Sequence, residues 1–127
     1  RQMCIRDSTL IPGLVTKDGN VTLSYGVMGG EYQAFGHMQF LTRHLDYGMD
    51  VQMAQDTARF FPNPFADFVE VEAPVAESTR DALRALGHDI RLAGKPIGGS
   101  QAITIDWQTG LLTAGSDPRK DGCAMGY

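Results

Sequence analysis

The sequence predicts an α/β (α+β) layered fold with mainly antiparallel sheets. Apolar and β-branched runs at 10–16 and 21–28 flank the turn signal Lys-Asp-Gly-Asn at 17–20, which is typical of a β-hairpin. Strands at 102–106 and 111–114, around Trp107 to Gly110, predict a second hairpin. Between the hairpins the apolar spacing is mostly helical, so helices are expected to be segregated from most of the strands.

The first helix is predicted over 32–47, because apolar residues there recur at intervals of three and four. They are Phe35, Met38, Leu41 and Leu45. Gly48 is a suitable stop, and Asp50 is a suitable N-cap for a second helix over 51–59. Four methionines are expected to fill gaps in the core, Met28, Met38, Met49 and Met53.

The middle of the chain predicts a strand at 68–71, a helix at 76–86 and a strand at 89–92. Pro62 and Pro64 indicate an irregular stretch before this group. Three glycines at 94–99 indicate a loop, and the order of residues there is not that of a phosphate-binding loop.

Charged and titratable side chains give little local evidence of chemistry. Glu70 and Glu72 are expected on a solvated strand face, which is favoured over an acid–base pair. An irregular, mixed-charge tail is expected to form a salt-linked surface loop, with Asp117, Arg119, Lys120 and Asp121. His37 is interpreted as structural, and no two histidines have metal-ligand spacing.

Composition bounds the class of protein. The chain has 127 residues, 43% of them hydrophobic, which fits one globular domain or a large piece of one. Its formal net charge of −4 gives no support to a nucleic-acid interface, which needs a basic face. No apolar run approaches the roughly 18 residues of a membrane helix.

The pair Gly29-Gly30 is the most informative local feature, because it joins a predicted strand to a predicted helix. Successive glycines adopt backbone angles closed to other residues and let their N–H groups approach a bound atom. The helix start adds unpaired donors and a positive dipole end. The pair therefore suits a developing oxyanion, and the alternative interpretation is a tight turn.

Several segments, taken in order and at these spacings, resemble the C-terminal part of the small subunit of γ-glutamyltranspeptidases (glutathione hydrolases). The resemblance covers about 9–127. The segments are Val15-Thr16-Lys17-Asp18-Gly19, Gly26-Val27-Met28-Gly29-Gly30, Gly36-His37-Met38-Gln39, Leu45-Asp46-Tyr47-Gly48-Met49-Asp50, Ala58-Arg59-Phe60, Gly98-Gly99-Ser100-Gln101-Ala102-Ile103 and Gly115-Ser116-Asp117-Pro118-Arg119.

This resemblance implies part of a four-layer αββα N-terminal-nucleophile hydrolase fold. It also implies chemistry in which a threonine, freed by self-cleavage, attacks a small-molecule γ-glutamyl amide such as glutathione and forms an acyl-enzyme. Gly29 and Gly30 match the family's oxyanion-binding glycines. The resemblance implies no cofactor and no metal.

Ser8 and Thr9 are the predicted substrate-binding residues. Ser8-Thr9-Leu10 stands where family members carry a Ser-Ser-Met run that helps to bind the glutamyl carboxylate. The hydroxyl groups are kept and the motif is not. A related amide or β-lactam side-chain acylase and a non-catalytic homologue therefore stay open as alternatives.

The chain is expected to be a fragment whose partner is the upstream remainder of the same precursor, which carries the large subunit and the threonine. Alone it is expected to be inactive. Residues 1–8 are predicted to be a non-native or unstructured start, since Arg1 to Asp7 match nothing in the family. The sequence leaves open a bacterial periplasmic, extracellular or cytoplasmic location.

Overall fold

The computed structural model describes residues 11–126, which fall into two compact units. Unit 1 contains the chain up to Asp56 and from Gly98 onward, and unit 2 runs from Thr57 to Ile97. Within residues 11–126 no helix combines the length and the apolar character needed to cross a membrane.

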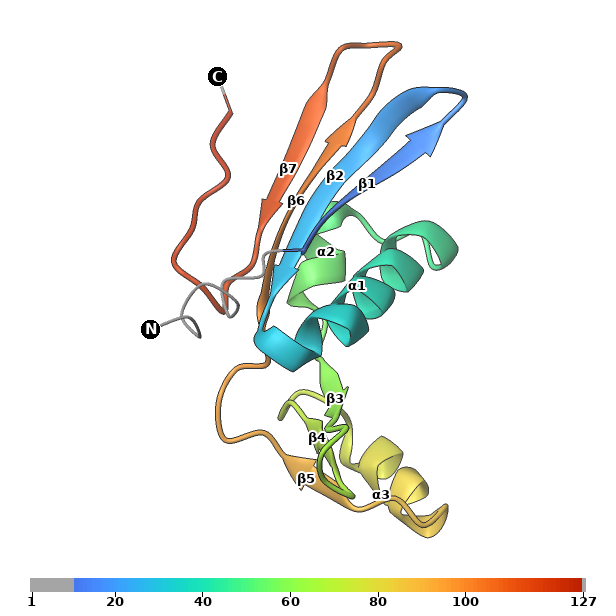
Figure 1. Ribbon diagram of the computed structural model, residues 1–127, viewed down its shortest axis with the longest axis vertical. Helices are drawn as coiled ribbons and strands as arrows, with labels where there is room; N and C mark the ends of the chain where they lie inside the picture. Colours follow the sequence, from blue (N-terminus) through green and yellow to red (C-terminus); the bar gives the residue numbers. More distant parts are fainter. Residues whose placement is uncertain (1–10, 127) are drawn as a thin grey trace, which may run out of the picture. The chain divides into compact units, whose positions relative to one another are not determined.

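A four-stranded antiparallel sheet frames unit 1, in the order β1-β2-β6-β7 (Figure 1). The strands are β1 (Ile11–Lys17), β2 (Asn20–Met28), β6 (Gly99–Ile105) and β7 (Leu112–Ser116). Both predicted hairpins are confirmed. Asp18 and Gly19 have φ of 52° and 82°, as expected for a tight hairpin turn that needs positive φ at both central positions.

β6 begins at Gly99, three residues before the predicted strand. Met28 pairs with Gly99 and Val27 pairs with Ser100, so pairing with β2 makes a strand of residues that look like a loop. In the second hairpin, the carboxylate of Asp106 accepts hydrogen bonds from the Gln108 amide and the Thr109 hydroxyl. These bonds lower the pKa of Asp106, the Thr109 hydroxyl contributing most.

The predicted first helix is confirmed as three consecutive helical segments. They are a 3₁₀ turn (Gly30–Tyr32), α1 (Gln33–Leu41) and a π-helical turn (Thr42–Asp46). Gly48, with φ of 68°, follows them. α2 (Val51–Asp56) then starts with the predicted cap, because the Asp50 carboxylate accepts a 2.7 Å hydrogen bond from the Met53 amide.

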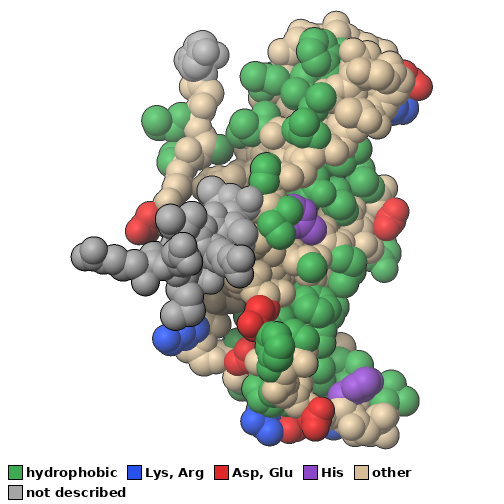
Figure 2. Space-filling model, viewed as in Figure 1, with side chains coloured by type: hydrophobic (Ala, Val, Ile, Leu, Met, Phe, Trp, Pro, Cys, Tyr) green, Lys and Arg blue, Asp and Glu red, His purple; other side chains and the backbone are tan. Residues whose placement is uncertain are grey.

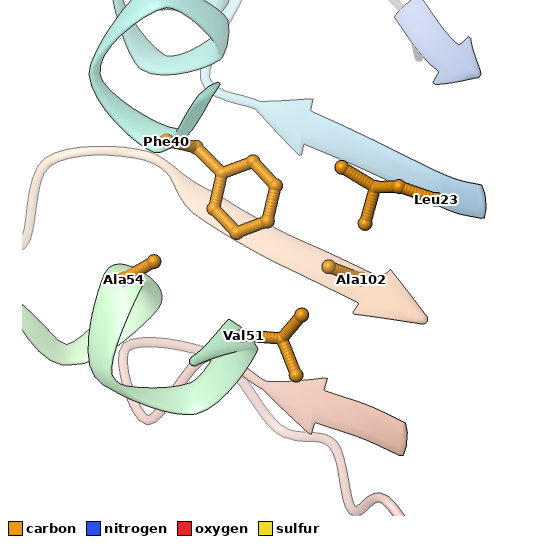
Figure 3. Packing of buried hydrophobic residues seen from close by; sticks show 5 residues of the cluster. All are labelled: Leu23, Phe40, Val51, Ala54 and Ala102. Carbon is orange, nitrogen blue, oxygen red and sulfur yellow. The ribbon is translucent and has the colours of Figure 1, made fainter. Parts of the chain in front are cut away.

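Both helices cover one face of the sheet, where the core lies (Figures 1 and 3). Leu23 and Ala102 point from β2 and β6 toward side chains of α1 and α2. All members of this cluster are at most 3% exposed. The helical members are Phe40, Val51 and Ala54.

The buried face of α1 is not the one that its apolar spacing indicates. Met38 and Leu45 are 46% and 54% exposed, and Met53 of α2 is 54% exposed, so the expectation that Met38 and Met53 fill the core is wrong. The buried side of the 3₁₀ turn and α1 has the same helical period with mostly polar or small members. They are Tyr32, Gln33, Gly36, Gln39 and Phe40.

The opposite face of the sheet is apolar and exposed. Side chains alternate along a strand, so residues next to the core members point away from the helices. Leu14, Ile103 and Leu112 are 63%, 43% and 62% exposed there. A depression of about 260 Å³ is lined by residues of β1, β2 and β6, with Gly26 among them. Hydrophobic side chains are visible on the surface of this unit in Figure 2.

Unit 2 is a small three-stranded sheet with one helix. Its strands are β3 (Phe60–Pro62), β4 (Val69–Val71) and β5 (Ile90–Leu92), in that order, and its helix is α3 (Glu77–Ala85). The predicted strands and helix are confirmed. β3 was not predicted, because Pro62 indicates an irregular stretch; as the last residue of an edge strand, it is a proline that a sheet tolerates.

A buried carboxylate links the first and last segments of unit 2. Glu72 is 8% exposed and accepts hydrogen bonds from the amides of Arg59 (2.8 Å) and Ile97 (3.1 Å). The Arg59 guanidinium donates a 2.8 Å hydrogen bond to the Ile97 carbonyl. The prediction that Glu72 is solvated is therefore wrong, because backbone donors at both ends of the unit satisfy its charge.

Replacing Glu72 with alanine should loosen both ends of unit 2. The Arg59 and Ile97 amides would lose their charged acceptor inside the protein, at a cost of about 2–4 kcal/mol. Native-state hydrogen exchange of the precursor should show faster exchange at these two amides. Glu70→Ala, in the same segment, is the matched control and should leave both unchanged. Equal protection in the two variants would contradict this role for Glu72.

Candidate active site

The candidate site is the loop between β2 and α1. Gly29 has φ of 135° and ψ of 26°, and Gly30 has φ of 57°, which are angles that favour glycine. The Gly29 carbonyl accepts a 3.1 Å hydrogen bond from the Tyr32 amide. The Gly30 carbonyl accepts one from the Gln33 amide. Both carbonyl groups therefore accept hydrogen bonds from amides at the start of the helical region.

The outer side of this loop is open. Gly29 and Gly30 are both exposed, and a methyl group built on Gly30 would meet no atom within 4 Å. Gly30 is the first residue of the 3₁₀ turn, and N–H groups at a helix start have no partner inside the helix. The arrangement therefore offers a backbone donor at a positive dipole end, with room for a ligand oxygen.

The inner side of the loop is closely packed. Tyr32 is 2% exposed. A methyl group built on Gly29 would lie 3.0 Å from the Cα atom of Gly98, which precedes β6. One built on Gly98 would lie 2.7 Å from the Met28 carbonyl oxygen, and Gly98 itself has φ of 63°. The end of β2 and the start of β6 therefore approach each other through glycines.

A buried polar network is centred on Ser100, the second residue of β6. Ser100 Oγ is 3.0 Å from Gln55 Oε1 and 3.1 Å from Asp117 Oδ2, and the Ser100 amide donates to the same Asp117 oxygen. Arg119 donates from Nη1 to Asp117 Oδ1 (3.2 Å) and to the Gln55 carbonyl (2.8 Å). The network ties the C-terminal segment to β6 and α2.

Asp117 is 1% exposed, so the expected surface position is wrong for this residue. Its ion pair with Arg119 is present, and Lys120 and Asp121 are exposed, as expected. The Asp117 carboxylate is satisfied by the Ser100 amide and hydroxyl and by Arg119, which explains how a charged group is buried here. Asp117 belongs to the segment at 115–119, which is one of those that carry the family resemblance. The resemblance therefore singles out this residue, whereas the mixed charges of the tail indicate only a surface loop.

His37 lies on α1 against β1 and β2. Its ring centroid is 4.9 Å from that of Tyr25, and its Nε2 atom is buried with no hydrogen-bond partner among the described residues. Burial lowers the pKa of His37, and a hydrogen bond to the Ile11 backbone acts in the opposite direction. These contacts agree with the interpretation of His37 as structural.

The other predicted site residues, Ser8 and Thr9, lie outside the described residues. Sequence reasoning overlooked Tyr32 and Gly98, which pack directly against the glycine pair. The available signal for Gly98 was its place in the Gly98 to Ile103 segment. Among residues 11–126, no three His, Cys, Asp or Glu side chains gather as a metal site.

Comparisons with known proteins agree with this architecture. The family described as Gamma-glutamyltranspeptidase matches residues 6–127. The chain therefore belongs to the gamma-glutamyltranspeptidase family. A curated relative, the Glutathione hydrolase-like YwrD proenzyme of Bacillus subtilis (strain 168), is 36% identical over 125 residues. The match covers 93% of this chain and 24% of that relative, so the chain spans about a quarter of its length.

Solved structures give the same result. Gamma-glutamyltranspeptidase from Pseudomonas nitroreducens, complexed with L-DON, has a TM-score of 0.83 and 28% identity, covering 94% of this chain and 63% of that one. Cephalosporin acylase from Bacillus halodurans has a TM-score of 0.83 and 35% identity, covering 94% and 23%. The predicted N-terminal-nucleophile hydrolase fold, with mainly antiparallel sheets, is confirmed.

His37 should make stability depend on pH. Its folded pKa lies below the ordinary value of 6.5, so the unfolded chain binds more protons as the pH falls. The contribution is present above pH 6.5 and is lost as the pH falls toward the lower folded pKa. Melting temperatures of the precursor at several pH values should fall less steeply below pH 6.5 for His37→Gln than for the parent. His88→Gln, at an exposed histidine, is the control; parallel curves for all three proteins would refute the assignment.

Proposed function

We propose that the precursor containing this chain hydrolyses or transfers γ-glutamyl groups of small, glutathione-like amides through a threonine acyl-enzyme. Within this chain, Gly29 and Gly30 supply the backbone N–H groups that stabilise the oxyanion. The observation that carries the proposal is the exposed glycine loop at the end of β2, whose Gly29-Gly30 sequence resembles the family's glycine pair.

The proposed chemistry divides the work between this chain and the upstream part. The threonine hydroxyl oxygen forms a bond to the amide carbon, and its proton passes to a base, for which the α-amino group of the same threonine is suited. The carbonyl oxygen becomes an oxyanion next to the glycine loop. Collapse of this intermediate expels the amine and leaves the acyl-enzyme, which water or another amine then attacks.

A fixed pair of amide donors suits this step because the charge to be stabilised appears only in the transition state. Donors held by the fold need no reorganisation when the oxyanion forms. Gly29 and Gly30 have no side chains to fill the space that the oxyanion needs, and the open side of Gly30 agrees with that requirement. Ser8 and Thr9 are proposed to contact the acyl group of the substrate through their hydroxyl groups.

The second candidate function is a related amide or β-lactam side-chain acylase. It is supported by the 35% identity to the Bacillus halodurans cephalosporin acylase and by Ser8-Thr9-Leu10, which departs from the family's carboxylate-binding run. A non-catalytic homologue is the third candidate. The upstream sequence discriminates among them: a threonine at the cleavage position with a basic carboxylate anchor supports the first, a threonine without the anchor the second, and no threonine the third.

The decisive test is Gly30→Ala in the full-length precursor. Because a side chain there intrudes on the oxyanion, the rate of acylation should fall about 10²–10³-fold while KM stays within about threefold. Single-turnover assays with a chromogenic γ-glutamyl anilide measure this. Gly29→Ala should behave similarly, with added strain from its contacts with Gly98 and Tyr32.

Gly48→Ala is the matched control. Gly48 has φ of 68°, close to that of Gly30, and a methyl group on either would meet nothing within 4 Å. The two variants should therefore lose similar stability through backbone strain, about 1–3 kcal/mol. Only Gly30→Ala should lose acylation. If Gly30→Ala folds, matures and acylates at the parental rate, the pair is only a turn.

We also propose that the upstream remainder covers the exposed apolar face of the unit 1 sheet. Leu14, Ile103 and Leu112 lie on this face, and Ile103 also lines the depression around Gly26. Neighbouring apolar side chains exposed on a sheet are typical of a surface that packs against another layer. The family relative is a longer proenzyme, which supplies the chain needed for such a layer.

Purified alone, the chain should therefore aggregate and hydrolyse no γ-glutamyl anilide. Co-expression with the upstream remainder should return it to the soluble fraction as a complex. Ile103→Asp should abolish this recovery, and Leu86→Asp, at a 77% exposed leucine of unit 2, should preserve it. A monomeric chain that melts cooperatively, or turnover that co-purifies with it, would contradict the proposal.

A further inference from the structure

The side chain of Tyr32 packs against three glycines from separate parts of unit 1. A methyl group on Gly98 would lie 2.4 Å from its Cδ1 atom, and one on Gly36 would lie 2.7 Å from its Cε1 atom. One on Gly29 would lie 3.3 Å from Cδ1. Gly98 directly precedes β6, Gly36 lies in α1, and Gly29 directly follows β2. Any larger residue at the tightest two would displace the ring.

The same residue also holds the glycine loop through its backbone. Its amide donates the 3.1 Å hydrogen bond to the Gly29 carbonyl, and it ends the 3₁₀ turn that begins at Gly30. Its side chain is 2% exposed, so the ring is enclosed. Tyr32 therefore fixes the loop from both backbone and side chain.

Two successive glycines need such an anchor. Glycine has the widest choice of backbone angles, so an unsupported Gly29-Gly30 pair would sample many orientations of its N–H groups. Oxyanion stabilisation depends on donors that already point at the developing charge. A ring that packs on one side of the loop restricts the glycines and leaves their other side open.

We propose that Tyr32 is a positioning residue that holds the Gly29–Gly30 amides in the oxyanion-binding orientation. This inference rests on the proposed function of the glycine pair and adds the residue that makes the pair rigid. Tyr32 itself does not touch the reacting atoms. Its ring acts by shape, so phenylalanine should replace it and a smaller aliphatic side chain should not.

The test uses the full-length precursor with Tyr32→Leu, Tyr32→Phe and Phe40→Leu. Phe40 is a 3% exposed ring of the same helix that belongs to the core cluster, and it controls for a general loss of stability. Tyr32→Leu should lower the acylation rate by at least about tenfold with KM within about twofold, because only the transition state needs the aligned donors. Affinity for a boronic-acid analogue of the γ-glutamyl group should fall by a similar factor.

Tyr32→Phe should stay within about threefold of the parent, and Phe40→Leu should melt earlier without the loss of rate. Hydrogen exchange at the amides of residues 32 and 33, which donate to the Gly29 and Gly30 carbonyls, should accelerate in Tyr32→Leu only. Should that variant fail to fold, Gly36→Ala displaces the ring without removing it. Its methyl group would also lie 2.5 Å from Val27 Cγ1, so Gly36→Ala is compared with and without Val27→Ala to separate the two contacts. It should give the same loss of rate and the same faster exchange.

The two proposals fail in different ways. Normal acylation by Gly30→Ala would end the oxyanion assignment whatever Tyr32 does. Loss in Gly30→Ala together with normal rate and exchange in Tyr32→Leu would overturn the role of Tyr32 alone. If the precursor turns over no γ-glutamyl anilide, the proposed substrate is wrong. Exchange at the amides of residues 32 and 33 then decides whether Tyr32 holds the loop.

Discussion

The antiparallel pairing of β2 with β6 is the constraint on which the rest of unit 1 depends. It joins segments that lie about 70 residues apart in sequence, with Val27 opposite Ser100 and Met28 opposite Gly99. This register brings the loop after β2 against Gly98 and places Leu23 and Ala102 on the same face, under the helices. A shift of one residue would put Leu23 and Ala102 on opposite faces of the sheet and move the loop away from its glycine contact.

Buried polar groups hold the ends of both units. In unit 1, Asp117 accepts from the Ser100 amide and hydroxyl and from Arg119, so the C-terminal segment is bound to β6. In unit 2, Glu72 accepts from two backbone amides that lie far apart in sequence. In both cases, a carboxylate replaces lost hydration with several short hydrogen bonds, and loss of either would leave buried donors without an acceptor.

The sequence predicts the elements of this fold well where local chemistry decides them. The Asp18-Gly19 turn, the Asp50 cap and the Gly48 stop follow from side-chain size and backbone angles, and all three are present. Long-range effects are less predictable. The phase of α1 was misjudged because its buried side carries Gln33, Gly36 and Gln39, which hydropathy assigns to solvent. The burial of Glu72 and Asp117 depends on donors from distant segments, which no local pattern shows.

The glycine loop shows why a candidate site can be predicted only in part from the sequence. The Gly29-Gly30 pair indicates unusual backbone angles, because few other residues tolerate the positive φ values found there. The pair alone does not specify which of many backbone shapes it takes. That choice comes from Tyr32 on the helix side and Gly98 across the sheet, and the second depends on strand register. Glycine provides access to the loop backbone, and an enclosed ring beside it supplies the rigidity that glycine lacks. The proposed functional unit is therefore the pair together with its packing partners.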